Sequence, residues 1–187
     1  MRLIRAHGWV RETKKPQKYL DKYPDIDPRF LFVNLGYNLR LTEIQGAMGS
    51  VQLPKLKGFV ESRRNSAQIM ITGLSKYKSV IQFQEETPKG MHSWFGFPII
   101  VSKKALFSTS DLRQYLELNG IETRPIICGN IALQPAVKMY KHRVYGRLEN
   151  ASHVMKNGLA VACHQSLDEN ACQHIVNTIS SFIDSYL

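Results

Sequence analysis

The hydrophobic positions along this chain change their spacing several times, and each spacing predicts a different element. Three- and four-residue spacing predicts a helix from Thr42, with Gln45 as its capping partner, and a second helix from Pro54 to about Tyr77. The apolar stripe of the second helix also includes Arg63. We expect the first helix to be buried through one apolar stripe, which consists of Ile44, Ala47, Met48 and Val51.

Alternating patterns predict short strands in the second half of the chain. Residues 80–84 alternate weakly, and residues 93–101 form a stronger pattern in which Pro98 indicates an edge or a bulge. Two further short strands are expected at residues 121–125 and 159–163.

Helices separate these strands. We expect one that is capped by Ser110 or Thr109 and ends at Asn119 and Gly120, one at residues 149–157 that is closed by Gly158, and an amphipathic one at residues 168–186. The order helix-helix-β-β-α-β-α-β-α predicts a mixed α/β protein of the α+β type, with its helices on one face of a small sheet.

The first 30 residues are less regular. The opening string MRLIRAHGW is typical of a helix end that Gly8 stops as its C′ residue. Residues 12–30 are polar and contain three prolines, so they are expected to form a long surface loop. A loop of that length is usually functional or covered by a partner.

The charge of the chain changes the picture only in part. It is strongly basic, with a formal net charge of +10, and the basic residues concentrate in residues 1–40 and 138–147. Such an excess suits nucleic acid, but it suits an anionic small ligand such as a nucleotide-sugar diphosphate equally well. Because no RNA-recognition motif, zinc finger or clear helix-turn-helix pattern accompanies it, a solvated basic surface is favoured over a nucleic-acid site.

Cysteine usage and apolar run length bear on location. Cys128, Cys163 and Cys172 have neither CxxC nor zinc spacing, which indicates reduced thiols in a cytoplasmic protein and no metal site. The longest apolar runs, residues 95–101 and 159–163, are far too short to span a bilayer, so no membrane association is expected.

Five longer strings identify a family when they are taken in order. They are RAHGW at residues 5–9, NLGYNLRLTEIQ at 34–45, HSWFGFPI at 92–99, GIETRPIICGN at 120–130 and NGLAVACHQSL at 157–167. Together they resemble the DegT/DnrJ/EryC1/StrS family of pyridoxal-phosphate (PLP) sugar aminotransferases and dehydratases. The last three strings are most similar to the branch that contains the GDP-4-keto-6-deoxymannose 3-dehydratases and related lipopolysaccharide-biosynthesis proteins.

This resemblance implies a fold type I PLP architecture of which the large domain is largely missing. Residues 1–55 would be the tail of the large PLP domain, with an active-site loop and an interdomain helix, and residues 56–187 the small C-terminal α+β domain. In the family the PLP-bearing lysine, replaced by histidine in the 3-dehydratase branch, lies upstream of the element matched by RAHGW. We therefore expect no catalytic residue in this chain and no turnover by the chain alone.

The resemblance also implies roles for particular side chains. Asn38 would reach the PLP phosphate of the neighbouring subunit in a homodimer. The substrate contacts implied on the sugar side are His7, Glu122, Arg124, Trp94 and Asn130.

The residues themselves leave other roles open. His7 could cap the carbonyls of a helix end, and Asn38 could be a turn residue. Glu122 and Arg124 occupy alternate strand positions, so they share one face and could form a surface ion pair. Trp94 could pack in the core, and the CGN string at residues 128–130 could be a plain turn.

Three functions follow, in decreasing order of support. The first is the C-terminal portion of a PLP-dependent aminotransferase or 3-dehydratase that acts on nucleotide-linked 4-keto-6-deoxy sugars. The second is a non-catalytic remnant that dimerises or pairs with a complementing N-terminal half. The third is a basic nucleic-acid-binding module, for which charge is the only support.

Overall fold

The computed structural model describes residues 1–187, the side chain of Glu12 excepted. The chain divides into two compact units, Met1–Lys55 and Leu56–Leu187, and each is described by itself. Among the described residues, no helix combines the length and the apolar character needed to cross a membrane.

The first unit consists mainly of short helical turns. Its elements are α1 (Arg2–Arg5), η1 (Val10–Glu12), α2 (Gln17–Leu20), η2 (Pro28–Phe30), α3 (Glu43–Gln52) and η3 (Leu53–Lys55). The expected long loop therefore contains two ordered turns. Pro16 precedes α2 and Pro28 begins η2, because the fixed φ of proline suits a helix start. Asp27 caps η2 by accepting the N–H of Arg29 at 2.9 Å.

α1 ends differently from the sequence-based prediction. His7 is the first residue after the helix with a left-handed backbone, at φ 58°, and Gly8 follows at φ 83°. The N–H of Gly8 donates to the carbonyl of Leu3 at 2.7 Å, which satisfies one of the carbonyls left open at the helix end. Two consecutive left-handed residues thus close the helix, and Gly8 alone does not.

The capping of α3 is confirmed, whereas its predicted burial is wrong for this chain. Thr42 Oγ1 accepts the N–H of Gln45 at 3.3 Å, and Gln45 Oε1 accepts the N–H of Thr42 at 2.9 Å. Ile44, Met48 and Val51 nevertheless expose 74%, 63% and 62% of their surface. An apolar stripe defines which face of a helix favours burial, but burial requires another element to cover it.

The second unit contains a four-stranded sheet with helices around it. Its elements are α4 (Leu56–Gly73), η4 (Ser75–Tyr77), β1 (Ile81–Phe83), β2 (Gly96–Val101), α5 (Thr109–Leu118), β3 (Thr123–Arg124), η5 (Ile131–Leu133), α6 (Pro135–Lys138), α7 (Glu149–Asn157), β4 (Gly158–Ala162) and α8 (Glu169–Asp184). The strand order is β1-β2-β4-β3, and every neighbouring pair is antiparallel. The predicted succession of long helices and strands is confirmed for this unit.

β2 lies inside the sheet, although it contains a proline. Ile99 pairs with Phe83 of β1 on one side and with Leu159 of β4 on the other. Pairing with β1 stops at Ile99, so Pro98 has a neighbouring strand only on the β4 side, where it lies opposite Ala160. At this point β2 is a local edge, which is where a strand tolerates proline.

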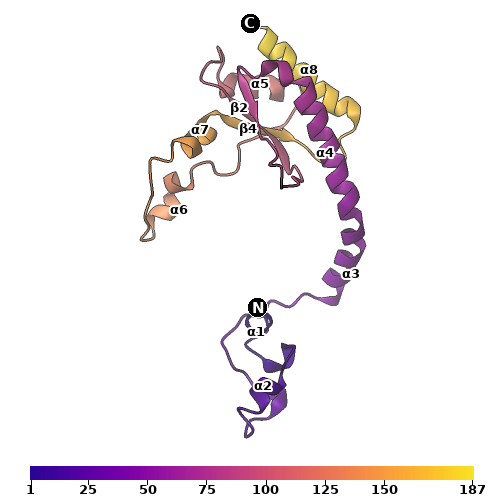
Figure 1. The fold of residues 1–187 in the computed structure, drawn as a ribbon, viewed down its shortest axis with the longest axis vertical. Helices are drawn as coiled ribbons and strands as arrows, with labels where there is room; N and C mark the ends of the chain where they lie inside the picture. The colour runs from indigo at the N-terminus through magenta and orange to yellow at the C-terminus, as the bar shows by residue number, and fades with distance from the viewer. The chain divides into compact units, whose positions relative to one another are not determined.

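The hydrophobic core occupies one face of the sheet. Alternate residues of β2 from Phe97 to Val101 are buried there, under α4, α5 and α8 (Figure 1). Each of these helices contributes to the same cluster, for example through Met70, Leu112 and Ile179. Because this face is continuous and apolar, burial of these side chains stabilises the whole unit.

α7 departs from the predicted arrangement of all helices on one face. It contacts β2 and β4 and lies on the opposite side of the sheet from α4 and α8 (Figure 1). Gly158 permits this close approach at the start of β4. A Cβ there would lie 2.5 Å from the carbonyl oxygen of Val154 and 2.7 Å from the side chain of Ile126.

The cap of α5 is Ser108, so the prediction of Ser110 or Thr109 is wrong. Ser108 Oγ accepts the N–H of Asp111 at 3.2 Å, and the Asp111 carboxylate accepts the N–H of Ser108 at 2.9 Å. The hydrogen bonds that the Asp111 carboxylate accepts from the N–H and the hydroxyl of Ser108 lower the pKa of Asp111. Three successive hydroxyl residues offer three caps, and an acidic residue three positions after Ser108 selects the first of them.

Candidate functional site

The first unit brings two of the predicted site residues together. The N–H of His7 donates to the carbonyl of Tyr37 at 2.9 Å, and Ala6 forms an antiparallel bridge with Asn38. His7 and Asn38 are both exposed. Two segments that are far apart in the sequence are therefore paired through their backbones, and one carries the exposed His7 and the other the exposed Asn38.

Two glycines make this pairing possible. A Cβ at Gly8 would lie 1.6 Å from the carbonyl oxygen of Asn34, and one at Gly36 would lie 2.6 Å from the carbonyl oxygen of Ile4. Any side chain at Gly8 would also be strained by its positive φ. The tight contact between the two backbones depends on residues without side chains.

An aromatic cluster lies in the same unit. The indole of Trp9 stacks with the rings of Phe30 and Phe32, at centroid distances of 6.4 and 5.8 Å. The guanidinium carbons of Arg11 and Arg40 each lie 5.3 Å from the Trp9 ring. Flat rings beside guanidinium groups are suited to a planar or anionic ligand.

The second unit carries a groove of about 510 Å³ on the side of the sheet that faces away from the core. Alternate residues of β2 and β4, such as Pro98 and Ala160, form its floor. Its walls and rim include Phe95, Ile126, Ile127, Arg63, Glu122 and Arg124. The groove combines an apolar floor with a few charged groups at its edge, as small-molecule sites commonly do.

Glu122 and Arg124 meet at the rim of this groove. Arg124 Nη2 and Glu122 Oε1 form an ion pair, so the prediction that the two side chains share one face is confirmed. Thr123 between them is buried and donates its hydroxyl to Glu117 at 2.7 Å, which lowers the pKa of Glu117. Because both charges are largely exposed, the pair contributes little to stability and leaves both groups accessible.

Trp94 and Asn130 lie elsewhere. Trp94 exposes 4% of its surface, packs on Phe97 and lines the cavity between α4 and β1. Asn130 is also 4% exposed; its amide donates to Ser152 Oγ at 3.0 Å and its carbonyl accepts the N–H of Ala132 at 3.1 Å. Both side chains have structural partners, and a direct contact of either with substrate stays a prediction.

Sequence reasoning missed the contacts that two arginines of α4 make with the segments before β2 and after β4. Arg63 donates to Gln165 Oε1 at 3.0 Å and to the carbonyl of Trp94 at 3.2 Å, and Arg64 pairs with Glu86 at 2.6 Å. A signal was present, because Arg63 falls on the apolar stripe of its helix. A cation on a buried face needs acceptors from another segment.

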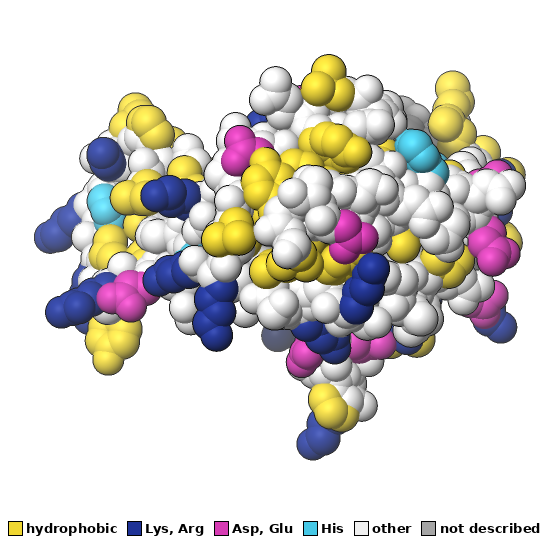
Figure 2. All heavy atoms as spheres, turned by 90° about the horizontal axis from the view of Figure 1, so that it is seen from above, with side chains coloured by type: hydrophobic (Ala, Val, Ile, Leu, Met, Phe, Trp, Pro, Cys, Tyr) yellow, Lys and Arg dark blue, Asp and Glu magenta, His cyan; other side chains and the backbone are white. Residues whose placement is uncertain are grey.

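The Lys and Arg side chains do not form one uniformly positive surface. The segment between α6 and α7 is exposed and rich in Lys and Arg, and it lies at the left in Figures 1 and 2. Elsewhere on the face shown in Figure 2, Lys and Arg alternate with Asp and Glu. Among the described residues, no three His, Cys, Asp or Glu side chains are grouped so that they could hold a metal ion.

The fold and the sites formed by the five sequence strings indicate the class of protein. The DegT/DnrJ/EryC1/StrS aminotransferase family matches residues 1–180, and the chain belongs to this family, as the sequence elements predicted. One relative is GDP-4-keto-6-deoxy-D-mannose 3-dehydratase from Escherichia coli O55:H7, which is 39% identical over 167 residues, 87% of this chain and 42% of the relative. Another is the lipopolysaccharide biosynthesis protein RfbH from Salmonella typhimurium, which is 30% identical over 83% of this chain and 36% of its own length.

Solved structures agree with this relationship. The E. coli 3-dehydratase with bound hydrated PLP superposes with a TM-score of 0.82 at 34% identity, over 94% of this chain and 45% of that one. A variant of a GDP-4-keto-6-deoxymannose-3-dehydratase with bound GDP-perosamine gives a TM-score of 0.81 at 33% identity, over 95% and 46%. The chain thus spans less than half the length of these relatives.

Proposed function

We propose that this chain acts as the C-terminal portion of a PLP-dependent enzyme for nucleotide-linked 4-keto-6-deoxy sugars in lipopolysaccharide or deoxysugar biosynthesis. The likeness to the E. coli 3-dehydratase along most of the chain carries this proposal. Residues 1–55 would be the tail of the large PLP domain with its active-site loop and interdomain helix, and residues 56–187 the small domain. A cytoplasmic location is part of the same proposal.

Each unit would contribute side chains to the active site of a homodimer. Asn38 would donate its amide to the phosphate of PLP held by the neighbouring subunit. His7, which lies next to it, would hydrogen-bond the keto-sugar. Glu122 would accept hydrogen bonds from sugar hydroxyls, and Arg124 would hold Glu122 in place or bind an anionic group of the substrate.

The residues present fit PLP only in part. The exposed carboxamide of Asn38 is a suitable phosphate donor, but this chain offers no match for the family's PLP-bearing lysine or histidine. PLP supplies an electron sink for a carbanion on the substrate. The upstream residue decides between transamination and 3-dehydration, so both reactions stay within the proposal.

A spectroscopic PLP titration tests the proposal. The purified chain is titrated alone and after mixing with a separately expressed large domain of the E. coli relative. We expect absorbance of bound PLP only in the mixture. Binding in neither sample would contradict an active-site contribution, and binding by the chain alone would show that the main cofactor anchors lie within it.

The exposed stripe of α3 favours a second candidate, a non-catalytic chain that dimerises or pairs with a complementing N-terminal half. Ile44, Met48 and Val51 are each more than 60% exposed, and such a stripe is typical of an interaction face. Size-exclusion chromatography with light scattering, compared with Met48→Lys, separates a self-associating chain from a monomer. Self-association without PLP binding in any mixture would favour this candidate.

A further inference from the structure

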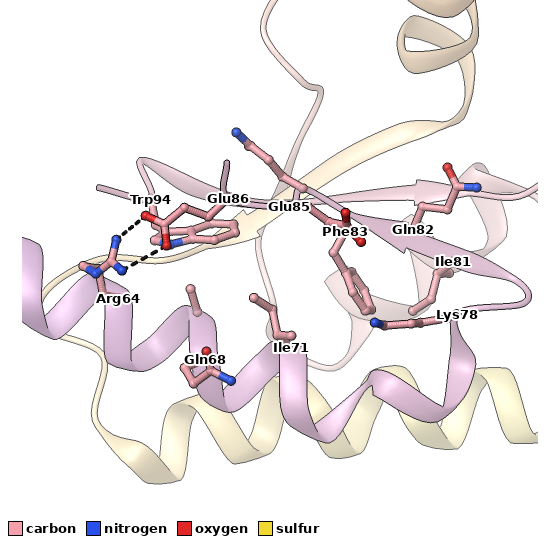
Figure 3. A pocket seen from close by; sticks show the side chains of 12 residues that line it. Arg64, Gln68, Ile71, Lys78, Ile81, Gln82, Phe83, Glu85, Glu86 and Trp94 are labelled. Atoms are coloured by element: carbon pink, nitrogen blue, oxygen red, sulfur yellow. Dashed lines mark hydrogen bonds and ion pairs between the residues drawn. The ribbon is translucent and has the colours of Figure 1, made fainter. Parts of the chain in front are cut away.

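Two consecutive arginines of α4 hold the segment that enters β2. The guanidinium of Arg64 donates to both carboxylate oxygens of Glu86, at 2.6 and 3.0 Å (Figure 3). It also donates to the carbonyl of His92 at 2.9 Å. The guanidinium of Arg63 donates to the carbonyls of Trp94 and Phe95, at 3.2 and 3.4 Å. One helix thus holds the backbone of this segment at the carbonyls of His92, Trp94 and Phe95.

Glu86 lies in the loop between β1 and β2, and its carboxylate binds the backbone of His92. Its Oε1 accepts the N–H of His92 at 2.5 Å in addition to the contact with Arg64. The side-chain hydrogen bond from Arg64, and then the backbone hydrogen bond from His92, lower the pKa of Glu86 to about 2. The carboxylate therefore stays charged, and the hydrogen bond that it accepts from His92 is charge-assisted.

The backbone that these contacts hold is unfavourable by itself. Trp94 adopts φ 50°, a left-handed conformation that bulky residues avoid. The Nδ1 of His92 accepts the N–H of Trp94 at 2.6 Å, and the two rings lie 4.5 Å apart. This turn directs Trp94 into the core and leaves the next residue, Phe95, 79% exposed on the wall of the groove.

We propose that Glu86 is a positioning residue, which acts through Arg64 and the backbone of His92 to hold His92 and Phe95 at the groove. Arg63 also holds this turn, because its guanidinium donates to the carbonyls of Trp94 and Phe95. What the groove binds rests on the proposed function, namely the sugar nucleotide. The positioning itself rests only on the contacts of Glu86, Arg63 and Arg64.

The test compares Glu86→Gln with Glu61→Gln in the full chain. Both changes replace a carboxylate by an amide, but Glu61 lies on the exposed side of α4, where it pairs with Lys57 at 3.9 Å. We expect Glu86→Gln to lower the hydrogen-exchange protection of the His92 amide by about tenfold or more, because a charge-assisted hydrogen bond is lost. In a Trp9→Phe background, Trp94 emission should shift to the red and the Phe95 ring resonances should move.

Glu61→Gln should leave all three signals unchanged, and the remaining core amides should keep their protection in both variants. Unchanged His92 protection and Trp94 emission in Glu86→Gln would overturn the proposal. If Glu86→Gln unfolds the unit, Arg64→Lys is measured in its place. Lysine keeps the positive charge but cannot donate to Glu86 and to the His92 carbonyl together. We therefore expect the same loss of His92 protection and the same shift of Trp94 emission. None of these signals needs a ligand, so failure of the PLP titration and failure of the positioning role are separate results.

Discussion

The backbone N–H of His7 donates to the carbonyl oxygen of Tyr37 at 2.9 Å. This hydrogen bond joins the RAHGW string to the GYN string and places His7 beside Asn38. The two side chains proposed to face substrate and cofactor are therefore presented by one paired backbone. A change that breaks the pairing should disable both side chains without altering either of them.

Gly8→Ala should break this pairing. Its new Cβ would lie 1.6 Å from the carbonyl oxygen of Asn34, at a φ of 83° that alanine avoids. We expect the first unit to lose at least about 2 kcal/mol of stability. The indole N–H of Trp9, which donates to the carbonyl of Arg29 at 2.7 Å, provides an NMR signal for the loss of structure.

Gly46→Ala is the matched control. A Cβ at Gly46 would meet nothing within 4 Å, and the residue lies within α3. Alanine should therefore stabilise the helix by about 0.5–1 kcal/mol. An unchanged Trp9 signal in Gly8→Ala would contradict the importance of the close backbone contact.

Glu122→Gln should separate stability from binding. The exposed ion pair with Arg124 contributes little, so the free energy of unfolding should change by less than about 1 kcal/mol. Binding of GDP-perosamine to the chain mixed with the large domain of the relative should weaken by roughly tenfold or more, through the loss of a charge-assisted hydrogen bond. Glu149→Gln, which removes another exposed partner of an arginine, should leave binding unchanged. Equal binding by both variants would argue against a substrate contact of Glu122.

The turn before β2 should respond to acid in a defined range. The pKa of Glu86 is lowered from 4.5 to about 2. The ionised carboxylate therefore contributes its full share of the folding stability above the unfolded-state pKa of 4.5, and this stability is lost as pH falls through about 2. In a Trp9→Phe background, Trp94 emission should show a step as pH falls toward about 2, where the Glu86 carboxylate takes up its proton. Glu86→Gln should abolish this step. Persistence of the step in that variant would assign it to another group.

The three thiols should differ sharply in reactivity. Cys128 is exposed, whereas Cys163 and Cys172 are buried. Burial raises the pKa of the Cys163 thiol to about 11, so at pH 8 it is almost wholly protonated and unreactive. Iodoacetamide should modify Cys128 first in the native protein, with the other two following only in denaturant, as mass spectrometry would show. Comparable modification rates at Cys128 and Cys163 would contradict the burial of Cys163, which directly follows β4.

Local signals predicted the second unit well. Spacing located α7 at residues 149–157, and alternation correctly placed Glu122 and Arg124 on one face. These features depend on a few neighbouring residues, so the sequence carries them directly. The cap at Ser108 was missed although its signal is local: of the three successive hydroxyl residues, Ser108 has an acidic residue three positions later, Asp111.

Long-range contacts could not be predicted in the same way. The Arg64–Glu86 pair, the left-handed Trp94 and the burial of Asn130 depend on segments that meet only in the folded chain. Position in a motif suggested that Trp94 and Asn130 face a ligand, whereas packing gives both of them structural partners. The stripe of α3 shows the converse, because its pattern predicts burial without specifying what covers it.

The most direct test of the central claim is the PLP titration of the mixture with Asn38→Ala, compared with Asn150→Ala, which changes an exposed asparagine of α7. If Asn38 donates to the cofactor phosphate, PLP affinity should fall by roughly tenfold or more in Asn38→Ala, because a hydrogen bond to a charged group is lost. Asn150→Ala should bind PLP as the unaltered chain does. Equal PLP affinity of the Asn38→Ala mixture and the unaltered mixture would contradict the claim that this surface forms part of the active site.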